Sequence, residues 1–260
     1  MLSDLIDSSA RIHPSAKIAK GVRIGPWCLV GENVSIGAGT VLDSHVVIRA
    51  NTRMGEGNRI FQFSSIGEDP ADKKFEGEES WLEIGDNNVF REGVTAHRGT
   101  AVGGGITKIG SNNLQMPYVH IAHDCIVGDN TVFANNVGIS GHVQVGDWAI
   151  LGGYAGVNQF LKIGAHAMVG AMTHITNDIP AFMIVSGRPA TVRSINAIGL
   201  ERRGLDKETI VDLREAYKII YKRNYSLQEA IDQLKAMREG CETMQVLIDS
   251  LESSEKGIHR

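Results

Sequence analysis

The sequence predicts a parallel β-helix followed by a small α-helical domain, and three observations support this prediction. An aliphatic residue recurs at every sixth position over much of the chain. A small or β-branched residue recurs four positions after each of those aliphatic residues. This six-residue period ends near Ile179, and after the SGRPA turn (186–190) the pattern becomes helical. We therefore expect the β-helix to span residues 1–190 and the helical domain to span residues 191–260.

The aliphatic positions can be followed along the chain as three runs. They extend from Ile12 to Ile66, from Ile84 to Ala96 and from Ile109 to Ile175, and Gln115 alone interrupts the last run. A period of six fits neither the 3.6 residues of a helical turn nor a two-faced strand. It fits a triangular coil in which three hexapeptides make one turn of eighteen residues. Such turns stack about 4.8 Å apart, and the stacking forms the core.

Glycines and cysteines fall at regular places in this frame. Glycine often follows the aliphatic residue directly, as at Gly25 and Gly37, and we interpret it as tolerating strained corner geometry. Cys28 and Cys125 occupy the small inward position, so we expect them to be core residues rather than nucleophiles. With Cys241 they make three cysteines, and this odd number and the wide spacing argue against a disulfide framework or a zinc knuckle.

The composition narrows the class of protein. Hydrophobic residues make up 42% and charged residues 22% of the 260 residues, an ordinary globular balance. The net charge of −4 argues against nucleic-acid binding by the chain as a whole. The N-terminus lacks a signal-peptide pattern, and no apolar run approaches the ~18 residues of a membrane span. We expect a cytoplasmic protein without stable membrane insertion.

Two stretches interrupt the repeat, and we expect both to be loops that leave the coil. The first lies near residues 67–83 and the second near residues 97–108. The second contains three consecutive glycines, 103–105, which could cradle a phosphate. Their spacing matches neither GxGxxG nor a P-loop, and no helical pattern follows, so a plain excursion is the better interpretation.

Helix signals begin after the repeat ends near Ile179. Asp206 or its neighbours can cap a helix that runs to about Arg223, and Ser226 with Glu229 forms a capping box for a second helix. Gly240 separates this from a third helix. The apolar residues on one face of the third helix are Met244, Leu247, Ile248 and Leu251.

One outer column of the coil combines polar groups suited to acyl transfer. His123 lies between inward positions, and steps of eighteen residues lead from it to Gly141 and Gln159. His142 stacks above Asp124 in the same way. A neutral imidazole can accept a proton near neutral pH, and a bare glycine N–H can approach an oxyanion. A polar outer face on which histidines gather by chance would explain the column equally well. The isolated histidines His13, His45 and His259 are interpreted as ordinary surface residues.

The chain resembles the UDP-N-acetylglucosamine O-acyltransferases of lipid A biosynthesis over essentially its whole length. The most telling stretches are HIAHDC (120–125), SGH (140–142), NQF (158–160), IGAH (163–166) and GLERRG (199–204). The resemblance implies a left-handed coil and a homotrimer with active sites between neighbouring coils. It implies transfer of an (R)-3-hydroxyacyl chain from acyl carrier protein to the glucosamine 3-hydroxyl of UDP-N-acetylglucosamine, the first step of lipid A biosynthesis, without a metal or dissociable cofactor.

The same resemblance implies roles for individual residues. His123 matches the general base, Asp124 its orienting partner and Gly141 the backbone oxyanion donor. The positions that match substrate contacts are His120, His142 and Gln159, with Asp72 and Lys74 for the sugar and Asn196, Arg202 and Arg203 for the nucleotide and phosphates. The segment from Arg188 to Arg223 holds nine basic and five acidic residues, which suits either a solvated surface or a dock for an acidic partner or a diphosphate.

The chain departs from the family pattern at three places. Asn158 stands where a histidine is frequent, and Pro189 stands where a polar residue is frequent. The family sets acyl-chain length by side-chain bulk near Gly170, and the glycine expected next to it is replaced by Ala171. The resemblance therefore predicts a shortened acyl pocket.

Other classes remain open at this point. The related N-acyltransferase carries an N-terminal uridine-binding domain, for which a repeat that starts by Ile12 leaves no room. An acetyl-CoA-dependent acetyltransferase differs in its donor. The γ-class carbonic anhydrases share the coil and hold zinc with histidines five residues apart, a spacing that the present sequence lacks. An intersubunit zinc site built from other histidine pairs and a non-catalytic scaffold are the remaining alternatives.

Overall fold

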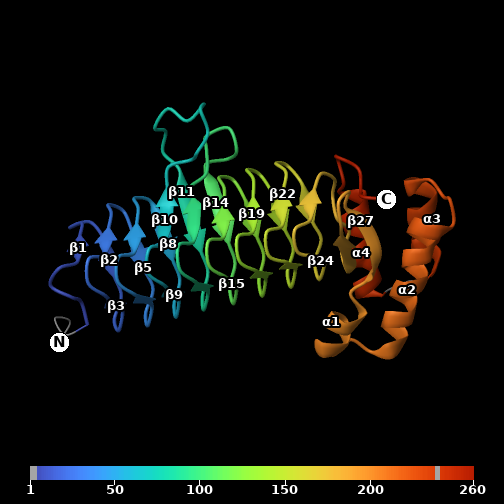
Figure 1. Cartoon of the computed structure of the whole chain (residues 1–260), viewed down its shortest axis with the longest axis horizontal. Helices are drawn as coiled ribbons and strands as arrows, with labels where there is room; N and C mark the ends of the chain where they lie inside the picture. The colour runs from blue at the N-terminus through green and yellow to red at the C-terminus, as the bar shows by residue number, and fades with distance from the viewer. Residues whose placement is uncertain (1–4, 238–240) are drawn as a thin grey trace.

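The computed structural model of the chain describes residues 5–237 and 241–260. It shows a long coil of short strands that ends in a group of helices (Figure 1). The strands form three parallel sheets, and each turn of the coil contributes one strand to each sheet. Partners in neighbouring turns are eighteen residues apart where no loop intervenes, as in the series Ile121, Ile139 and Val157. The predicted parallel β-helix is therefore confirmed.

The three sheets are numbered in the order in which the chain first enters them. The first sheet contains β1 (Arg11–Ile12), β4 (Leu29–Val30), β7 (Val47–Ile48), β10 (Ser65–Glu68), β13 (Thr95–His97), β16 (His120–Ile121), β19 (Gly138–Ile139), β22 (Gly156–Val157) and β25 (His174–Ile175). The second contains β2 (Lys17–Ile18), β5 (Ser35–Ile36), β8 (Thr52–Met54), β11 (Trp81–Ile84), β14 (Ile106–Ile109), β17 (Ile126–Val127), β20 (Gln144–Val145) and β23 (Lys162–Ile163). The third contains β3 (Arg23–Ile24), β6 (Val41–Leu42), β9 (Arg59–Ile60), β12 (Val89–Phe90), β15 (Leu114–Gln115), β18 (Val132–Phe133), β21 (Ile150–Leu151), β24 (Met168–Val169), β26 (Met183–Ser186) and β27 (Thr191–Ile195).

The core is a column of aliphatic side chains inside the coil. The repeat residues from Ile24 onward are almost entirely buried, and so are Cys28 and Cys125, as predicted. Gln115 occupies an inward position with no exposed surface, and neither polar atom of its side chain has a partner among the described residues. A single turn leaves its inward side chains open to water above and below, so only the stacking of many turns buries this apolar surface.

The interpretation of the repeat glycines as strained corner residues is wrong for most of them. The left-handed backbone conformation falls instead mainly on non-glycine corner residues such as Asn51 and Asn130. Glycines that follow the aliphatic residue are needed because neighbouring turns approach closely there. A Cβ on Gly37 would lie 2.3 Å from the carbonyl carbon of Gly55, and one on Gly146 would lie 2.6 Å from the amide nitrogen of Ala165. Glycine at this position permits the turns to stack.

The two non-periodic stretches are loops that project from one edge of the coil (Figure 1). Residues 69–80 connect β10 to β11, and residues 98–105 connect β13 to β14. Both connections pass from the first sheet to the second. They fall within the excursions predicted at 67–83 and 97–108, and they bring polar residues to the same edge.

A β-hairpin ends the coil. β26 continues the third sheet in parallel with β24, and β27 then pairs with β26 in the antiparallel direction. The division proposed at residue 190 falls between these two strands, so residues 191–195 belong with the sheet rather than with the helices. The hairpin forms because the chain turns back over residues 187–190 and resumes pairing.

Four helices follow in the described residues: α1 (Ala197–Arg202), α2 (Lys207–Lys222), α3 (Leu227–Met237) and α4 (Glu242–Glu252). The side chain of Asp206 caps α2, and Ser226 and Glu229 form the predicted reciprocal capping box at α3. Met244, Leu247, Ile248 and Leu251 are buried on α4, as predicted. Gly240 lies outside the described residues. None of the described helices has both the length and the apolar character that crossing a membrane requires.

The C-terminal tail returns from α4 to the last turn of the coil. His259 is 8% exposed, and its Nε2 accepts hydrogen bonds from the backbone N–H groups of Thr176 and Asn177, each at 3.2 Å. Ser254 donates to the carboxylate of Asp178 at 2.7 Å. The interpretation of His259 as a surface residue is therefore wrong, because the tail uses it to bind the end of the coil.

Candidate active site

The edge between the first and second sheets, here called the 1–2 edge, carries a stack of corner residues. Asp124, His142 and Phe160 are eighteen residues apart, and each has a positive φ near 60°. The backbone N–H of His142 donates to the carbonyl of His123 at 3.0 Å, and that of Phe160 donates to the carbonyl of Gly141 at 3.1 Å. The coil register thus fixes the positions of these side chains before any of them interacts.

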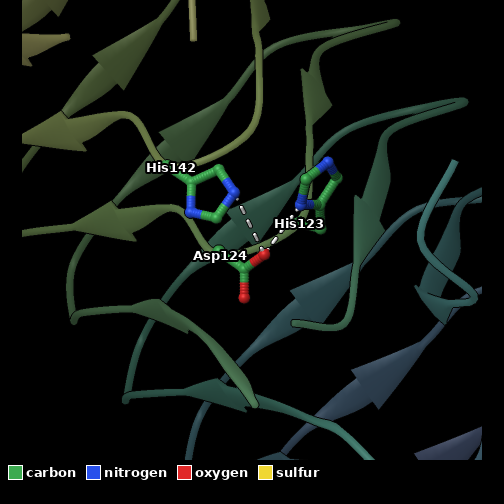
Figure 2. A group of neighbouring side chains, drawn as sticks. All are labelled: His123, Asp124 and His142. Atoms are coloured by element: carbon green, nitrogen blue, oxygen red, sulfur yellow. Dashed lines mark hydrogen bonds and ion pairs between the residues drawn. The ribbon is translucent and has the colours of Figure 1, made fainter. Parts of the chain in front are cut away.

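His123 and Asp124 form a hydrogen-bonded pair at this edge (Figure 2). Nδ1 of His123 lies 2.7 Å from Oδ2 of Asp124, and Nε2 of His142 lies 3.6 Å from the same oxygen. The Asp124 side chain is 1% exposed, whereas that of His123 is 13% exposed. The pairing through Nδ1 leaves Nε2 of His123 available to exchange a proton with a substrate.

Three residues outside the predicted set hold Asp124. Thr100 donates its backbone N–H to Oδ1 and its hydroxyl to Oδ2, both at 2.8 Å. The backbone N–H of Asp124 donates to Oγ1 of Thr107 at 2.7 Å. A Cβ on Gly103 would lie 2.0 Å from Cγ of Asp124, so only glycine fits there. The loop interpreted from sequence as a plain excursion therefore encloses the carboxylate, and its glycine cluster was the available signal.

Gly141 lies directly against the His123 ring. A Cβ at this position would lie 2.5 Å from Cε1 and 2.7 Å from Nε2 of His123. Within the described part of the chain, the Gly141 N–H makes no hydrogen bond. A free backbone donor thus lies beside the available nitrogen of the imidazole, which is the arrangement that acyl transfer needs.

A series of rings continues along the 1–2 edge from the His123–Asp124 pair. His142 meets His123 edge to face with ring centroids 5.2 Å apart, and Phe160 stacks on His142 at 4.4 Å. Nζ of Lys256, from the C-terminal tail, lies 5.8 Å from the Phe160 ring centroid. This series gives the edge an aromatic wall with a cation at its end.

His120 lies on the first sheet, close to His123. Its Nδ1 is 2.8 Å from the hydroxyl of Thr95, and its ring meets that of His97 at a centroid distance of 4.9 Å. Burial lowers the pKa of His120, with a smaller contribution from the charge of His123. Burial likewise lowers the pKa of His97 to about 4. Both rings are thus neutral near pH 7 and available as hydrogen-bonding groups.

The remaining predicted contacts at the 1–2 edge are Gln159, Asp72 and Lys74. Gln159 is exposed and lines a hollow of about 510 Å³ with Asn158, Thr176 and Lys256. Asp72 and Lys74 lie in the 69–80 loop, where Oδ1 of Asp72 accepts the backbone N–H of Lys74 at 3.0 Å.

A second group of predicted residues lies at a different edge, between the second and third sheets. Nη1 of Arg203 is 3.0 Å from Nδ1 of His166, and Nδ2 of Asn196 donates to the carbonyl of His166 at 3.0 Å. The Asn196 side chain also caps α1 by accepting the N–H of Gly199 at 3.2 Å. Burial lowers the pKa of His166 to about 4, and the charge of Arg203 contributes. Arg202 is exposed on α1.

Gly170 and Ala171 occupy the third edge, between the third and first sheets. Ala171 is exposed, and a Cβ on Gly170 would lie 2.8 Å from Cβ of Ser186. The predicted site residues of one chain thus lie on all three edges, and one chain alone does not bring them together.

The three residues in Figure 2 also lie close enough together for their side chains to hold a metal ion. One ligand atom each from His123, Asp124 and His142 lies within 4.8 Å of the others. Nevertheless, Oδ2 of Asp124 already accepts from Thr100 and His123, and Oδ1 accepts from Thr100. These donors fit a carboxylate that orients an imidazole better than a carboxylate that coordinates a metal.

Comparisons with known proteins identify the family. Residues 178–259 match the model described as UDP-N-acetylglucosamine O-acyltransferase, domain 2, and residues 106–141 match the bacterial transferase hexapeptide model. The chain is 51% identical over 255 residues to the acyl-[acyl-carrier-protein]–UDP-N-acetylglucosamine O-acyltransferase of Saccharophagus degradans, covering 98% of this chain and 99% of that protein. The chain belongs to the UDP-N-acetylglucosamine O-acyltransferase family.

Solved structures of the family agree with the fold. The structure of LpxA from Acinetobacter baumannii is 53% identical with a TM-score of 0.97, covering 99% of this chain and all of that chain. UDP-N-acetylglucosamine O-acyltransferase from Moraxella catarrhalis is 48% identical with a TM-score of 0.97, covering 98% of this chain and all of that chain. The family membership confirms that the coil is left-handed and that the protein is an acyltransferase.

Proposed function

We propose that the protein transfers an (R)-3-hydroxyacyl chain from acyl carrier protein to the glucosamine 3-hydroxyl of UDP-N-acetylglucosamine, the first step of lipid A biosynthesis. The observation that carries the proposal is the His123–Asp124 pair, with its imidazole lying over the free N–H of Gly141. The names of the nearly full-length relatives support the choice of donor and acceptor.

The first step is attack on the thioester. Nε2 of His123 accepts the proton of the sugar hydroxyl as its oxygen forms a bond to the thioester carbonyl carbon. Asp124 accepts the Nδ1–H of His123, which fixes the tautomer and stabilises the imidazolium as it forms. General-base help of this kind is typically worth about 10²–10⁴-fold in rate.

The second step is collapse of the tetrahedral intermediate. The Gly141 N–H donates to the oxyanion while the C–S bond is intact. The bond then breaks, the carrier's sulfur leaves as a thiolate, and the imidazolium returns the proton to it. No step draws on a metal or a dissociable cofactor.

The substrate contacts require more than one subunit. His120, His142 and Gln159 surround the reacting atoms, and Asp72 and Lys74 contact the sugar. Asn196, Arg202 and Arg203 contact the nucleotide and its phosphates from another edge of the coil. A homotrimer that places the 1–2 edge of one coil beside a neighbour would combine these groups in one cleft.

The donor contacts complete the proposal. The basic surface between Arg188 and Arg223 binds the acidic acyl carrier protein. Gly170 and Ala171 limit the length of the acyl chain, with the Ala171 methyl group shortening the pocket.

The test is transfer of radiolabelled UDP-N-acetylglucosamine to acylated product with 3-hydroxyacyl carrier proteins of several lengths. Acetyl-CoA serves as an alternative donor, and a parallel arm contains EDTA. Product from hydroxyacyl donors in both arms supports the proposal. Product from acetyl-CoA alone would reassign the donor. Loss of activity in EDTA with recovery on adding zinc would show that the His123, Asp124 and His142 cluster holds a metal.

A further inference from the structure

The loop of residues 98–105 contacts both halves of the proposed site. Thr100 and Gly103 enclose the Asp124 carboxylate, and other residues of the loop contact the 69–80 loop that carries Asp72 and Lys74. In the mechanism proposed above, no residue of this loop acts on a reacting atom. Its contacts nevertheless fix the groups that do.

The contact with the catalytic pair is made by Thr100. Its hydroxyl and its backbone N–H donate to the two oxygens of Asp124, each at 2.8 Å. The N–H of Gly103 donates to Oγ1 of Thr100 at 3.1 Å, so the hydroxyl proton is directed to the carboxylate. With Asp124 only 1% exposed, water does not replace a donor lost from this arrangement.

The contact with the acceptor loop is made by Arg98. Its guanidinium is almost buried, donates to the carbonyl of Gly67 at 2.8 Å and pairs with Asp69. The N–H of Arg98 donates to the carbonyl of Glu68 at 3.0 Å. Asp69 is therefore held where the loop leaves the coil, three residues before Asp72.

A further contact joins the loops at their other ends. The N–H of Ala101, next to Thr100, donates to Oε1 of Glu78 at 3.2 Å. The N–H of Trp81 donates to the carbonyl of Gly105 at 2.8 Å. The 98–105 loop thus contacts both ends of the 69–80 loop.

We propose that Thr100 is a positioning residue for the His123–Asp124 pair and that Arg98, through Asp69, positions the loop that binds the acceptor sugar. The 98–105 loop then serves catalysis and acceptor binding through two separable contacts. The inference rests on the proposed function, because it assigns these contacts to the two halves of that reaction.

The separation can be tested by steady-state kinetics. Thr100→Val removes the hydroxyl donor and lowers kcat by about 10–100-fold, the range for a hydrogen bond to a charged group, with KM for UDP-N-acetylglucosamine within about twofold. Thr100→Ser keeps the hydroxyl and restores most of kcat. Asp69→Asn instead raises this KM by about tenfold or more and leaves kcat within about threefold.

Matched controls separate positioning from loss of stability. Thr131 is fully buried, and its hydroxyl donates to Asn113 at 2.8 Å away from the 1–2 edge. Thr131→Val therefore lowers the melting temperature and leaves kcat unchanged. Glu83 pairs with Arg53 at 2.8 Å on the second sheet and so offers a matched arginine–carboxylate pair, and Glu83→Gln leaves KM unchanged.

Several results would overturn the inference. One is a wild-type kcat in Thr100→Val. A second is a kcat in Thr100→Ser as low as that in Thr100→Val. A third is a loss of kcat in Thr131→Val equal to that in Thr100→Val. An equal rise of KM in Asp69→Asn and Glu83→Gln would show that the Arg98–Asp69 contact does not position the acceptor loop. An inactive wild type would refute the proposed function instead, whereas an active wild type with a fully active Thr100→Val refutes this inference alone.

Discussion

The imidazole of His123 lies against Gly141, with Cε1 at 2.5 Å and Nε2 at 2.7 Å from the point that a Cβ on residue 141 would occupy. Residue 141 therefore must lack a side chain for His123 to keep its position. The same absence leaves the backbone N–H of residue 141 open to a substrate. One glycine thus fixes the place of the proposed base and supplies the proposed oxyanion donor.

Gly141→Ala should remove most activity without unfolding the coil. The added methyl group displaces the imidazole, and a displacement of about 1 Å at a reacting group can cost about 100-fold in rate. We expect kcat to fall by about that factor or more in the transfer assay. Gly138→Ala is the matched control, since a Cβ at residue 138 meets nothing within 4 Å. Activity of Gly141→Ala within about fivefold of the wild type would contradict this account of the site.

Ala171→Gly should lengthen the preferred acyl chain. The variant removes a methyl group from the exposed corner at the third edge, where the pocket is proposed to end. Competition between hydroxyacyl carrier proteins of different lengths measures the preference directly. An unchanged ratio of products would show that Ala171 does not limit the pocket.

His166 should make folding stability depend on pH. Burial lowers its pKa from an ordinary 6.5 to about 4, so below pH 6.5 the unfolded chain takes up a proton that the folded chain refuses. The contribution of His166 to stability is therefore complete above about pH 6.5 and is lost as the pH falls toward 4. His166→Gln should therefore reduce the fall in stability between pH 7 and 5, whereas substitution of the exposed His13 by glutamine should leave the contribution of His166 in place. Melting temperatures between pH 7 and 5 test the difference, and equal slopes in the wild type and His166→Gln would refute it.

Two nearby glycines distinguish close approach from backbone strain. Gly37→Ala places a Cβ 2.3 Å from the backbone of Gly55, and overpacking of this kind costs about 1–3 kcal/mol. Gly39 has φ +68° with open space around its Cβ position, and asparagine adopts the same conformation at other corners. Gly39→Asn should therefore change the free energy of unfolding by less than about 1 kcal/mol. Urea unfolding measures both changes, and the opposite order would contradict the explanation of the repeat glycines.

The sequence alone predicted the coil because its repeat is strictly periodic. A step of eighteen residues correctly placed Gly141 next to His123 in one outer column, and the capping residues at α2 and α3 were also found. The short helix α1, strand β27 and the return of His259 to the coil were missed. These features depend on tertiary contacts at the end of the coil, and a sequence repeat carries no information about such contacts.

The candidate site was predicted only where it follows the repeat. His123, Asp124 and His142 occupy periodic corner positions, so their proximity could be worked out in advance. Thr100 reaches Asp124 from a loop outside the repeat, 24 residues away in sequence. Its contact depends on how the loop folds back over the edge, which spacing cannot reveal.

The measurement that tests the central claim most directly is acyl transfer by His123→Ala beside the wild type and His13→Ala. His13 is an exposed histidine on the first turns of the coil and controls for the substitution itself. The account predicts that His123→Ala loses about 10²–10⁴-fold in kcat while His13→Ala keeps wild-type activity and both remain folded. Activity of His123→Ala close to that of the wild type would show that another group takes the proton from the sugar hydroxyl.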